Sequence, residues 1–146
     1  MQAVRAFVTD HPIRPEELLD LVARPGHGAT NLFTGAVRDH HEGRAVRAVT
    51  YDCFRPLAEK VLAELAAEAA LKHSALIAVA HRVGRLEVGE ISVAIAAGSA
   101  HRGAAFEASR EVIEAIKVRL PVWKKEHYVD GDGAWLAGCA LAAKPR

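Results

Sequence analysis

Apolar and polar positions recur along the chain with two periods, and these predict both strands and helices. Within residues 46–54, Val49, Tyr51 and Cys53 occupy every second position, as in a strand with one buried face. Further strands are predicted at residues 4–9, 31–38, 76–83 and 91–97. Two closing segments, 122–129 and 134–136, flank Asp130-Gly131-Asp132-Gly133 and predict a hairpin.

Three segments have a helical pattern. A short helix is predicted over residues 16–22, with Pro15 in its first turn. The clearest helix opens at Pro56 and runs to about Lys72; its predicted buried stripe is Leu57, Val61, Leu62, Leu65, Ala66 and Ala69. Another long helix starts at Arg102 and is ended by Pro121; its predicted buried stripe is Ala105, Phe106, Val112, Ile113 and Ile116.

The order of these elements predicts the fold class. Pairs of strands separate the helices, whereas a doubly wound sheet would alternate strand and helix more strictly. We therefore expect an α+β fold with a mixed or antiparallel sheet, in which residues 84–89 connect two strands. No linker or repeat interrupts the chain, so residues 1–146 are expected to form a single domain.

Composition narrows the class of protein. The chain has 146 residues, 51% of them hydrophobic, and a formal net charge of +1, which suits a globular protein and excludes a general nucleic-acid coat. No apolar run approaches the ~20 residues that cross a bilayer, so no membrane partner is expected. Cys53 and Cys139 form no CxxC motif and Met1–Asp10 resembles no secretory signal, so the expected location is the cytoplasm.

The first candidate for chemistry is Ser99-Ala100-His101-Arg102-Gly103, at the predicted start of a long helix. Unpaired N–H groups and the positive end of the helix dipole, together with His101 and Arg102, would bind phosphate or carboxylate. The same residues also fit a helix capped by Ser99 with a solvated arginine. The spacing leaves both interpretations open.

A second group of charges surrounds Pro121. Lys117 and Arg119 lie in the last helical turn, where cations commonly complement the helix dipole. Lys124, Lys125 and Glu126, however, follow directly on the rigid Pro121-Val122-Trp123 corner. Lysines held beside an aromatic residue and a proline are less readily explained as a free surface.

Arg38 is a third candidate, because it ends a predicted strand, although such a residue is as often only solvent-facing. His40 and His41 follow it, but adjacent side chains diverge, so no metal site is expected. The chain has no Gly-x-Ser-x-Gly, P-loop or dinucleotide-binding glycine pattern, and neither cysteine has an evident base. The residues alone predict a pocket for an anion and name no reaction.

Four blocks, in order and at the family's approximate spacing, resemble the large, catalytic subunit of molybdopterin synthase. They span about residues 3–136, and they are Phe33-Thr34-Gly35-Ala36-Val37-Arg38, His81-Arg82-Val83-Gly84, Ser99-Ala100-His101-Arg102 with Phe106-Glu107-Ala108, and Ile116-Lys117 through Pro121-Val122-Trp123-Lys124-Lys125-Glu126.

The resemblance implies an α/β-hammerhead-type fold and a homodimer, with a small ubiquitin-like sulfur-carrier subunit docked at each end. It implies a sulfurtransferase without a cofactor, which converts cyclic pyranopterin monophosphate into the molybdopterin dithiolene. The sulfur would arrive as a thiocarboxylate on the carrier's C-terminal Gly-Gly, which would explain an enzyme of this class without a catalytic cysteine.

The resemblance also assigns residues. Lys117 and Lys124 match the family's active-site lysines; Lys117 would stabilise negative charge and move protons, with a pKa lowered by burial near Arg102 and other cations. His101 and Arg102 match ligands of the substrate phosphate. The remaining matches to substrate-contacting positions are Arg38, the main chain of Ala36 and Val37, and the pocket wall of Lys125 and Glu126.

Two other functions compete with this assignment. A non-catalytic module could bind a phosphate or pterin in the same pocket, or a scaffold could use the basic corner to dock an acidic partner. A degenerate relative would be expected to have lost one of the lysines, whereas Lys117 and Lys124 are both present. We therefore expect the enzyme.

Overall fold

A computed structural model describes residues 4–137. Three helices and nine strands follow one another in the order β1 (Val4–Thr9), α1 (Pro15–Val22), β2 (Ala29–Ala36), β3 (His40–His41), β4 (Arg44–Cys53), α2 (Arg55–His73), β5 (Leu76–Arg82), β6 (Gly84–Glu87), β7 (Ile91–Ser99), α3 (Arg102–Arg119), β8 (Val122–Tyr128) and β9 (Gly131–Ala137).

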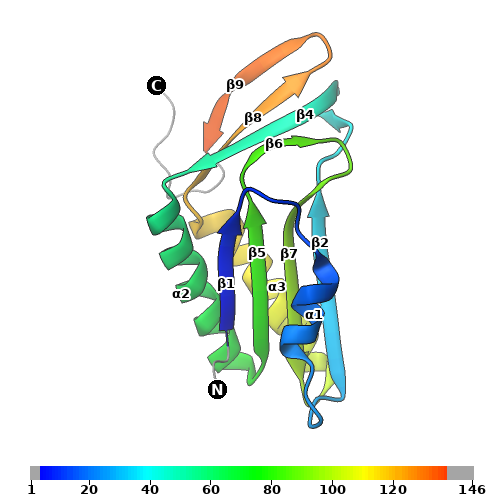
Figure 1. Cartoon of the computed structure of the whole chain (residues 1–146), viewed down its shortest axis with the longest axis vertical. Helices are drawn as coiled ribbons and strands as arrows, with labels where there is room; N and C mark the ends of the chain where they lie inside the picture. Colours follow the sequence, from blue (N-terminus) through cyan, green and yellow to red (C-terminus); the bar gives the residue numbers. More distant parts are fainter. Residues whose placement is uncertain (1–3, 138–146) are drawn as a thin grey trace.

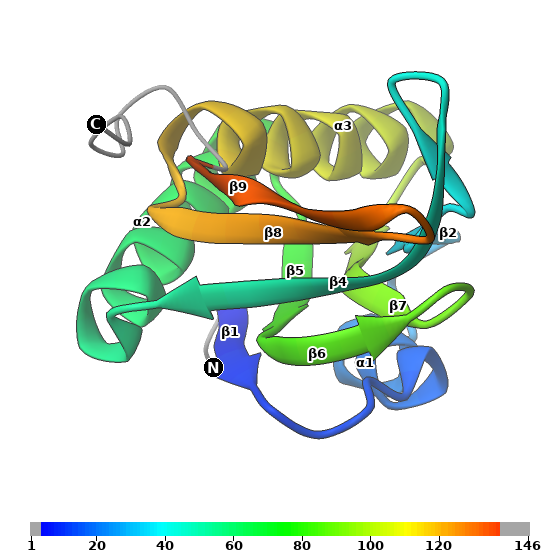
Figure 2. The same ribbon diagram turned by 90° about the horizontal axis from the view of Figure 1, so that it is seen from above.

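The first sheet has the strand order β1-β5-β7-β2. Its β1–β5 pair is parallel and its other pairs are antiparallel. Helices α2 and α3 cover one face and α1 covers the other (Figures 1 and 2). The central strands β5 and β7 are consequently buried on both faces, which explains why their sequences are nearly continuous apolar runs.

The second sheet lies across one end of the first (Figures 1 and 2). Its strand order is β3-β4-β8-β9, β6 adds to β4, and every pairing is antiparallel. A small apolar cluster stabilises this part of the fold; its buried members are Val37, Val46, Val49, Leu86 and Tyr128. The α+β class, the mixed sheet and the flanking helices are thus as predicted.

Residues 84–89 were expected only to connect two strands, and this prediction is wrong. Gly84–Glu87 forms β6 and pairs with β4, and Leu86 is fully buried there. A strand of four residues with one apolar side chain is too short to give a clear alternating pattern. The two-residue strand β3 escaped prediction for the same reason.

Two residues of the predicted helical stripes face solvent instead of the core. Leu57 is 46% exposed and Phe106 is 61% exposed. The buried faces are centred on small residues, among them Ala58 on α2 and Ala108 on α3, which let the helices pack closely against the sheet. The prediction gave weight to large apolar side chains and therefore placed the buried face of each helix wrongly by part of a turn.

Ser99 does not cap α3 as one interpretation required. The N-cap residue is His101, and it makes no side-chain capping bond. Ser99 is instead the buried last residue of β7, and its hydroxyl donates to the carbonyl oxygen of Ser74 at 3.2 Å. No helix among residues 4–137 is both long and apolar enough to cross a membrane.

Candidate active site

A cavity of about 210 Å³ lies where the end of α3 and the end of β2 meet the second sheet. It combines titratable groups from five segments of the chain. They are Arg38 after β2, His40 and His41 of β3, Tyr51 of β4, Lys117 of α3, and Lys124 and Glu126 of β8. The fold thus brings Arg38, Lys117 and Lys124 together, although they are far apart in the sequence.

Strand alternation decides which side chains of β8 reach the cavity. Lys124 pairs with Tyr51 and Glu126 with Val49 across the β4–β8 ladder, and all four line the cavity. Lys125 lies between them and therefore points to the opposite face. Its ammonium lies 3.9 Å from Asp132 there, so the prediction that Lys125 forms the pocket wall is corrected.

Glu126 and Lys124 form an ion pair within the cavity wall. The Lys124 Nζ–Glu126 Oε1 distance is 3.0 Å, and the Glu126 side chain is only 5% exposed. A carboxylate this buried needs a cationic partner, and Lys124 supplies it. The pair holds the Lys124 ammonium at a defined place in the wall.

Lys117 lines the cavity from the last turn of α3 and lies near Lys124. Burial lowers its pKa below the usual range, and the positive charge of Lys124 lowers that pKa further. The direction agrees with the prediction, but the neighbouring cation is Lys124 and not Arg102. An amine with a lowered pKa gives up its proton more readily than an ordinary lysine and can both donate and accept one.

Arg38 and the chain before it form another wall of the cavity. Ala36, Val37 and Arg38 all line it, and the Arg38 side chain is exposed. The main chain of Val37 is already occupied, because its N–H donates to Glu90 and its carbonyl accepts from Gly89. These bonds fix the loop and leave the Arg38 guanidinium as the group best able to bind an anion.

His101 and Arg102 lie at the other end of α3. A helix rises about 1.5 Å per residue, so Arg102 and Lys117 are about 22 Å apart along its axis. Both His101 and Arg102 are exposed. One chain therefore does not bring these two residues into the cavity with Lys117, contrary to the single pocket expected from the sequence.

Sequence reasoning missed two groups at the cavity, the histidine pair and the Tyr51 wall. His40 and His41 flank it on β3, where His40 Nδ1 lies 2.8 Å from Asp39 Oδ1 and His41 Nε2 lies 3.6 Å from Glu42 Oε1. Adjacent histidines on a turn gave no signal beyond the metal site that was discounted. Among the residues described, no three His, Cys, Asp or Glu side chains are grouped so as to hold a metal ion.

Behind the cavity wall, His81 packs edge-on against Tyr51, with ring centroids 5.3 Å apart. Burial lowers the pKa of His81 to about 4, against the smaller opposing effect of its bond to the Arg82 carbonyl. The imidazole is thus neutral at pH 7, and it supports Tyr51 without adding another charge beside Lys117.

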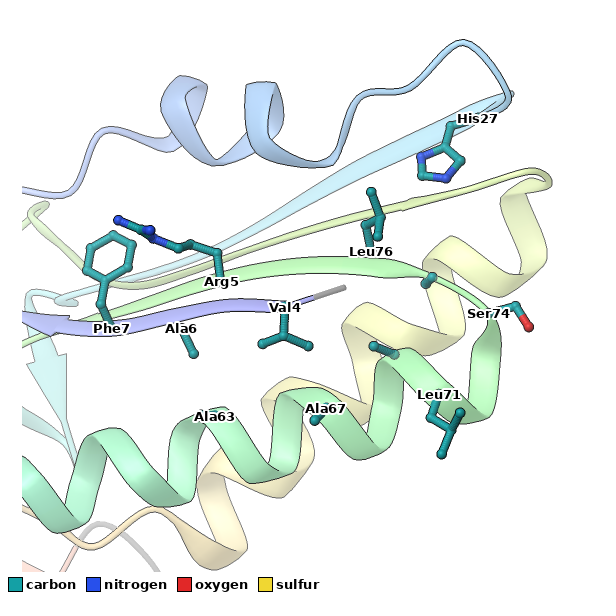
Figure 3. A pocket seen from close by; sticks show the side chains of 12 residues that line it. Val4, Arg5, Ala6, Phe7, His27, Ala63, Ala67, Leu71, Ser74 and Leu76 are labelled. Carbon is teal, nitrogen blue, oxygen red and sulfur yellow. The ribbon is translucent and has the colours of Figure 1, made fainter. Parts of the chain in front are cut away.

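A larger groove, of about 1000 Å³, borders β1 and α2 (Figure 3). In Figure 3 Val4 and Ala6 point toward α2, whereas Arg5 and Phe7 point away from it. Its lining is mainly apolar, and Arg5 and His27 are the titratable side chains along it. It lacks the converging charges of the smaller cavity, which is therefore the candidate active site.

Comparison with known proteins identifies the family. Residues 8–119 match the MoaE protein family, so the chain belongs to that family. A molybdopterin synthase catalytic subunit from Aspergillus niger is 41% identical over 89% of this chain and 73% of its own length. One from Thermoplasma volcanium is 41% identical over 88% of this chain and 94% of its own.

Solved structures agree with the family. Molybdopterin synthase from Staphylococcus aureus superposes with a TM-score of 0.82 at 34% identity, over 92% of this chain and 97% of that one. A Helicobacter pylori structure, a complex of subunits 1 and 2 of molybdopterin-converting factor, has a TM-score of 0.69 at 19% identity, over 90% of this chain and 88% of that one, and shares the fold.

Proposed function

We propose that this protein is the catalytic subunit of a molybdopterin synthase. It transfers sulfur from the thiocarboxylated C-terminus of a small carrier subunit to cyclic pyranopterin monophosphate and forms the molybdopterin dithiolene. The observation that carries this proposal is the cavity itself, where Arg38, Lys117 and Lys124 surround a space that no cysteine among residues 4–137 lines. The relatives named above share the activity by name.

Cys53 is a poor source of the sulfur. It lies at the end of β4, packs against the main apolar core and does not line the cavity. Burial and the charge of Asp52 raise the pKa of its thiol, which keeps it protonated and unreactive. Cys139 lies outside the described residues. A sulfur delivered by a partner protein fits these facts better than one carried by this chain.

The cations would act on charges that develop during the transfer. When the thiocarboxylate sulfur bonds to a pterin side-chain carbon, that carbon must give up an oxygen substituent. Water then cleaves the acyl–sulfur bond to the carrier, and the tetrahedral intermediate and the final carboxylate are both negative. The Lys117 ammonium can stabilise that charge, and its lowered pKa lets it exchange protons with the reacting atoms. Lys124, held by Glu126, orients the substrate, and Arg38 binds its phosphate.

We further propose that a homodimer completes the site through the outer edge of β2, which pairs with no other strand among residues 4–137. Ala29 pairs with Ser99 near His101, whereas Ala36 lies two residues before Arg38. Two copies pairing antiparallel along β2 would set each strand's start beside the other's end. His101 and Arg102 of a second copy would then approach Arg38 and Lys117.

The exposed side of β2 suits such a contact. Leu32 and Phe33 are large apolar residues on this strand and both are partly exposed to solvent. The Asn31 side-chain oxygen is buried and makes no hydrogen bond within the described residues. An exposed strand edge with apolar side chains is prone to pair with another strand. The phosphate ligands expected from the resemblance would in this way reach the cavity from the neighbouring subunit.

The carrier subunit and the location also belong to the proposal. The name catalytic subunit, borne by the relatives, implies a second subunit, and the Helicobacter pylori protein of this fold was solved as such a complex. A C-terminal Gly-Gly tail is narrow enough to enter a cavity of about 210 Å³. We place the reaction in the cytoplasm, because its reducing conditions preserve a thiocarboxylate and keep cysteines as free thiols.

Reconstitution tests the function. Purified protein, thiocarboxylated carrier and cyclic pyranopterin monophosphate should yield the dithiolene, whereas protein and pterin alone should yield none. Lys117→Ala should lower turnover about 100-fold or more, since it removes both charge stabilisation and a proton carrier. Lys60→Ala, a change to an exposed lysine of α2, is the matched control and should be neutral. Normal turnover in Lys117→Ala would refute the assignment; binding of pterin without transfer would favour a non-catalytic module.

A further inference from the structure

His127 is a buried histidine on the face of the second sheet that points away from the cavity. It belongs to β8, is 9% exposed and binds both neighbouring strands. Its Nε2 lies 2.7 Å from Thr50 Oγ1 on β4, and its Nδ1 lies 3.0 Å from Asp132 Oδ1 on β9. A single imidazole therefore joins three strands, and the contacts Thr50–His127–Asp132 are called the bridge below.

The two faces of β8 have different tasks. Lys124 and Glu126 alternate with Lys125 and His127, so the bridge lies directly behind the strand that supplies the cavity's lysine and its carboxylate. A slip of one residue along β8 would turn Lys125 and His127 toward the cavity and remove Lys124 and Glu126 from it. The site thus depends on the register of this strand.

That register needs fixing because the pairing on both sides of β8 is irregular. The β4–β8 ladder shifts between Val46 and Ala48, and the β8–β9 ladder shifts between Lys125 and His127. Such bulges redirect side chains and weaken the ladder locally. His127 lies at both irregularities, pairing with Ala48 on one side and Asp132 on the other.

The charges around the bridge favour one arrangement of protons. The bond from His127 lowers the pKa of Asp132, and Lys125 and Arg47 lower it further, so its carboxylate remains an acceptor. Nδ1–H of His127 therefore donates to Asp132, and Nε2 accepts the Thr50 hydroxyl. Both ring nitrogens are satisfied, as a buried histidine requires.

We propose that His127 is a positioning residue for the active site: through Thr50 and Asp132 it locks β8 in the register that presents Lys124 and Glu126 to the cavity. This inference rests on the proposed function for its effect on catalysis. The order Thr50, His127, Asp132 also resembles a catalytic triad of nucleophile, base and acid. Thr50, however, lies within the sheet between Arg85 and Lys125 of the adjacent strands, on the face opposite the cavity, which favours a lock.

Paired substitutions of Thr50 test the lock. Thr50→Val keeps the shape of the side chain and removes its hydroxyl, whereas Thr50→Ser keeps the hydroxyl. Arg47→Gln removes a charge 3.8 Å from Asp132 but leaves both hydrogen bonds of His127 in place, so it is the control for an electrostatic effect on Asp132 alone. In the reconstituted complex Thr50→Val should lower kcat about tenfold with little change in KM, and Thr50→Ser and Arg47→Gln should behave as wild type.

A second measurement does not depend on activity. Lys124 helps to keep the pKa of Lys117 low, so its displacement should raise that pKa, which NMR of labelled lysine side chains reports. We expect a rise in Thr50→Val and none in Thr50→Ser or Arg47→Gln. Should Thr50→Val fail to fold, Asp132→Ala breaks the other arm of the bridge and should produce the same rise.

The outcomes separate the two proposals. Equal Lys117 titration in Thr50→Val and Thr50→Ser would overturn the lock, whatever the activity. A covalent adduct on Thr50 during turnover would also overturn it, in favour of the catalytic triad. A Lys117 shift in Thr50→Val, together with a wild-type complex that makes no dithiolene, would support the lock and refute the proposed function.

Discussion

Burial governs the charges around the cavity residue by residue. Lys117 and His81 both have lowered pKa values, and in both cases desolvation is the main cause. The effect on Lys117 makes the proton of its ammonium easier to exchange. The effect on His81 keeps the imidazole behind Tyr51 uncharged. This histidine therefore adds no further positive charge next to the cavity.

His81 should make stability depend on pH. Its pKa is about 4 in the folded state and 6.5 in the unfolded chain, so the unfolded state binds more protons between these values and stability falls as pH falls. From pH 7 to pH 5 the loss from His81 should be about 2 kcal/mol. Urea unfolding of wild type and His81→Leu at both pH values measures this loss of stability. An equal loss in both proteins would contradict the lowered pKa of His81.

Part of the site could be predicted from the sequence. The lysine pair and Arg38 were assigned through four sequence blocks, and the cavity does gather them. Lys125 was misassigned although the signal was present, since the alternation of a strand at 122–129 separates it from Lys124 and Glu126. His101 and Arg102 could not be placed from sequence, because the length of α3 keeps them from Lys117 within one chain.

At the scale of elements, the site is assembled from the end of a helix, a loop after a strand and the body of another strand. The last turn of α3 carries Lys117, the loop after β2 carries Arg38, and β8 carries Lys124. Long periodic segments were predicted well, because apolar spacing reflects burial directly. The short strands β3 and β6 were missed, since their pairing with β4 is set by tertiary contacts and not by a local pattern.

The end of α2 offers a test of local backbone energetics. Ser74 is the C-cap residue, and its φ of 51° and ψ of 52° lie in the left-handed region, where glycine is favoured. Ser74→Gly should therefore raise the free energy of unfolding by about 0.5–1 kcal/mol. Chemical denaturation measures the change, and Gly43→Ala, at φ 76°, should move stability in the opposite direction. Destabilisation by Ser74→Gly would contradict this reading of the helix end.

At the scale of the whole molecule, the separation of His101 and Arg102 from Lys117 becomes informative. The two ends of α3 coincide with the two ends of β2, so antiparallel pairing of β2 with its copy would join the separated halves of the site. The dimer would then be part of the catalytic machinery and not only a means of stability.

Mixing inactive variants tests the shared site. Lys117→Ala and Arg102→Ala should each be impaired as homodimers. Refolded together in equal amounts, half of the dimers should be mixed, and one site in each should be intact, giving about a quarter of wild-type activity. The dithiolene assay measures this recovery. A mixture no more active than the separate variants would contradict a site built from two copies, and a monomer at all concentrations would exclude it.

The central claim is that fixed cations, without a thiol of this chain, direct the sulfur of a partner onto the pterin. Tracing labelled sulfur through the variant Cys53→Ser/Cys139→Ser tests it most directly. The account predicts that label placed on the carrier's thiocarboxylate appears in the pterin dithiolene at the wild-type rate, with none retained on this chain. Loss of transfer in the variant, or labelled sulfur bound to a cysteine of the wild-type chain during turnover, would contradict it.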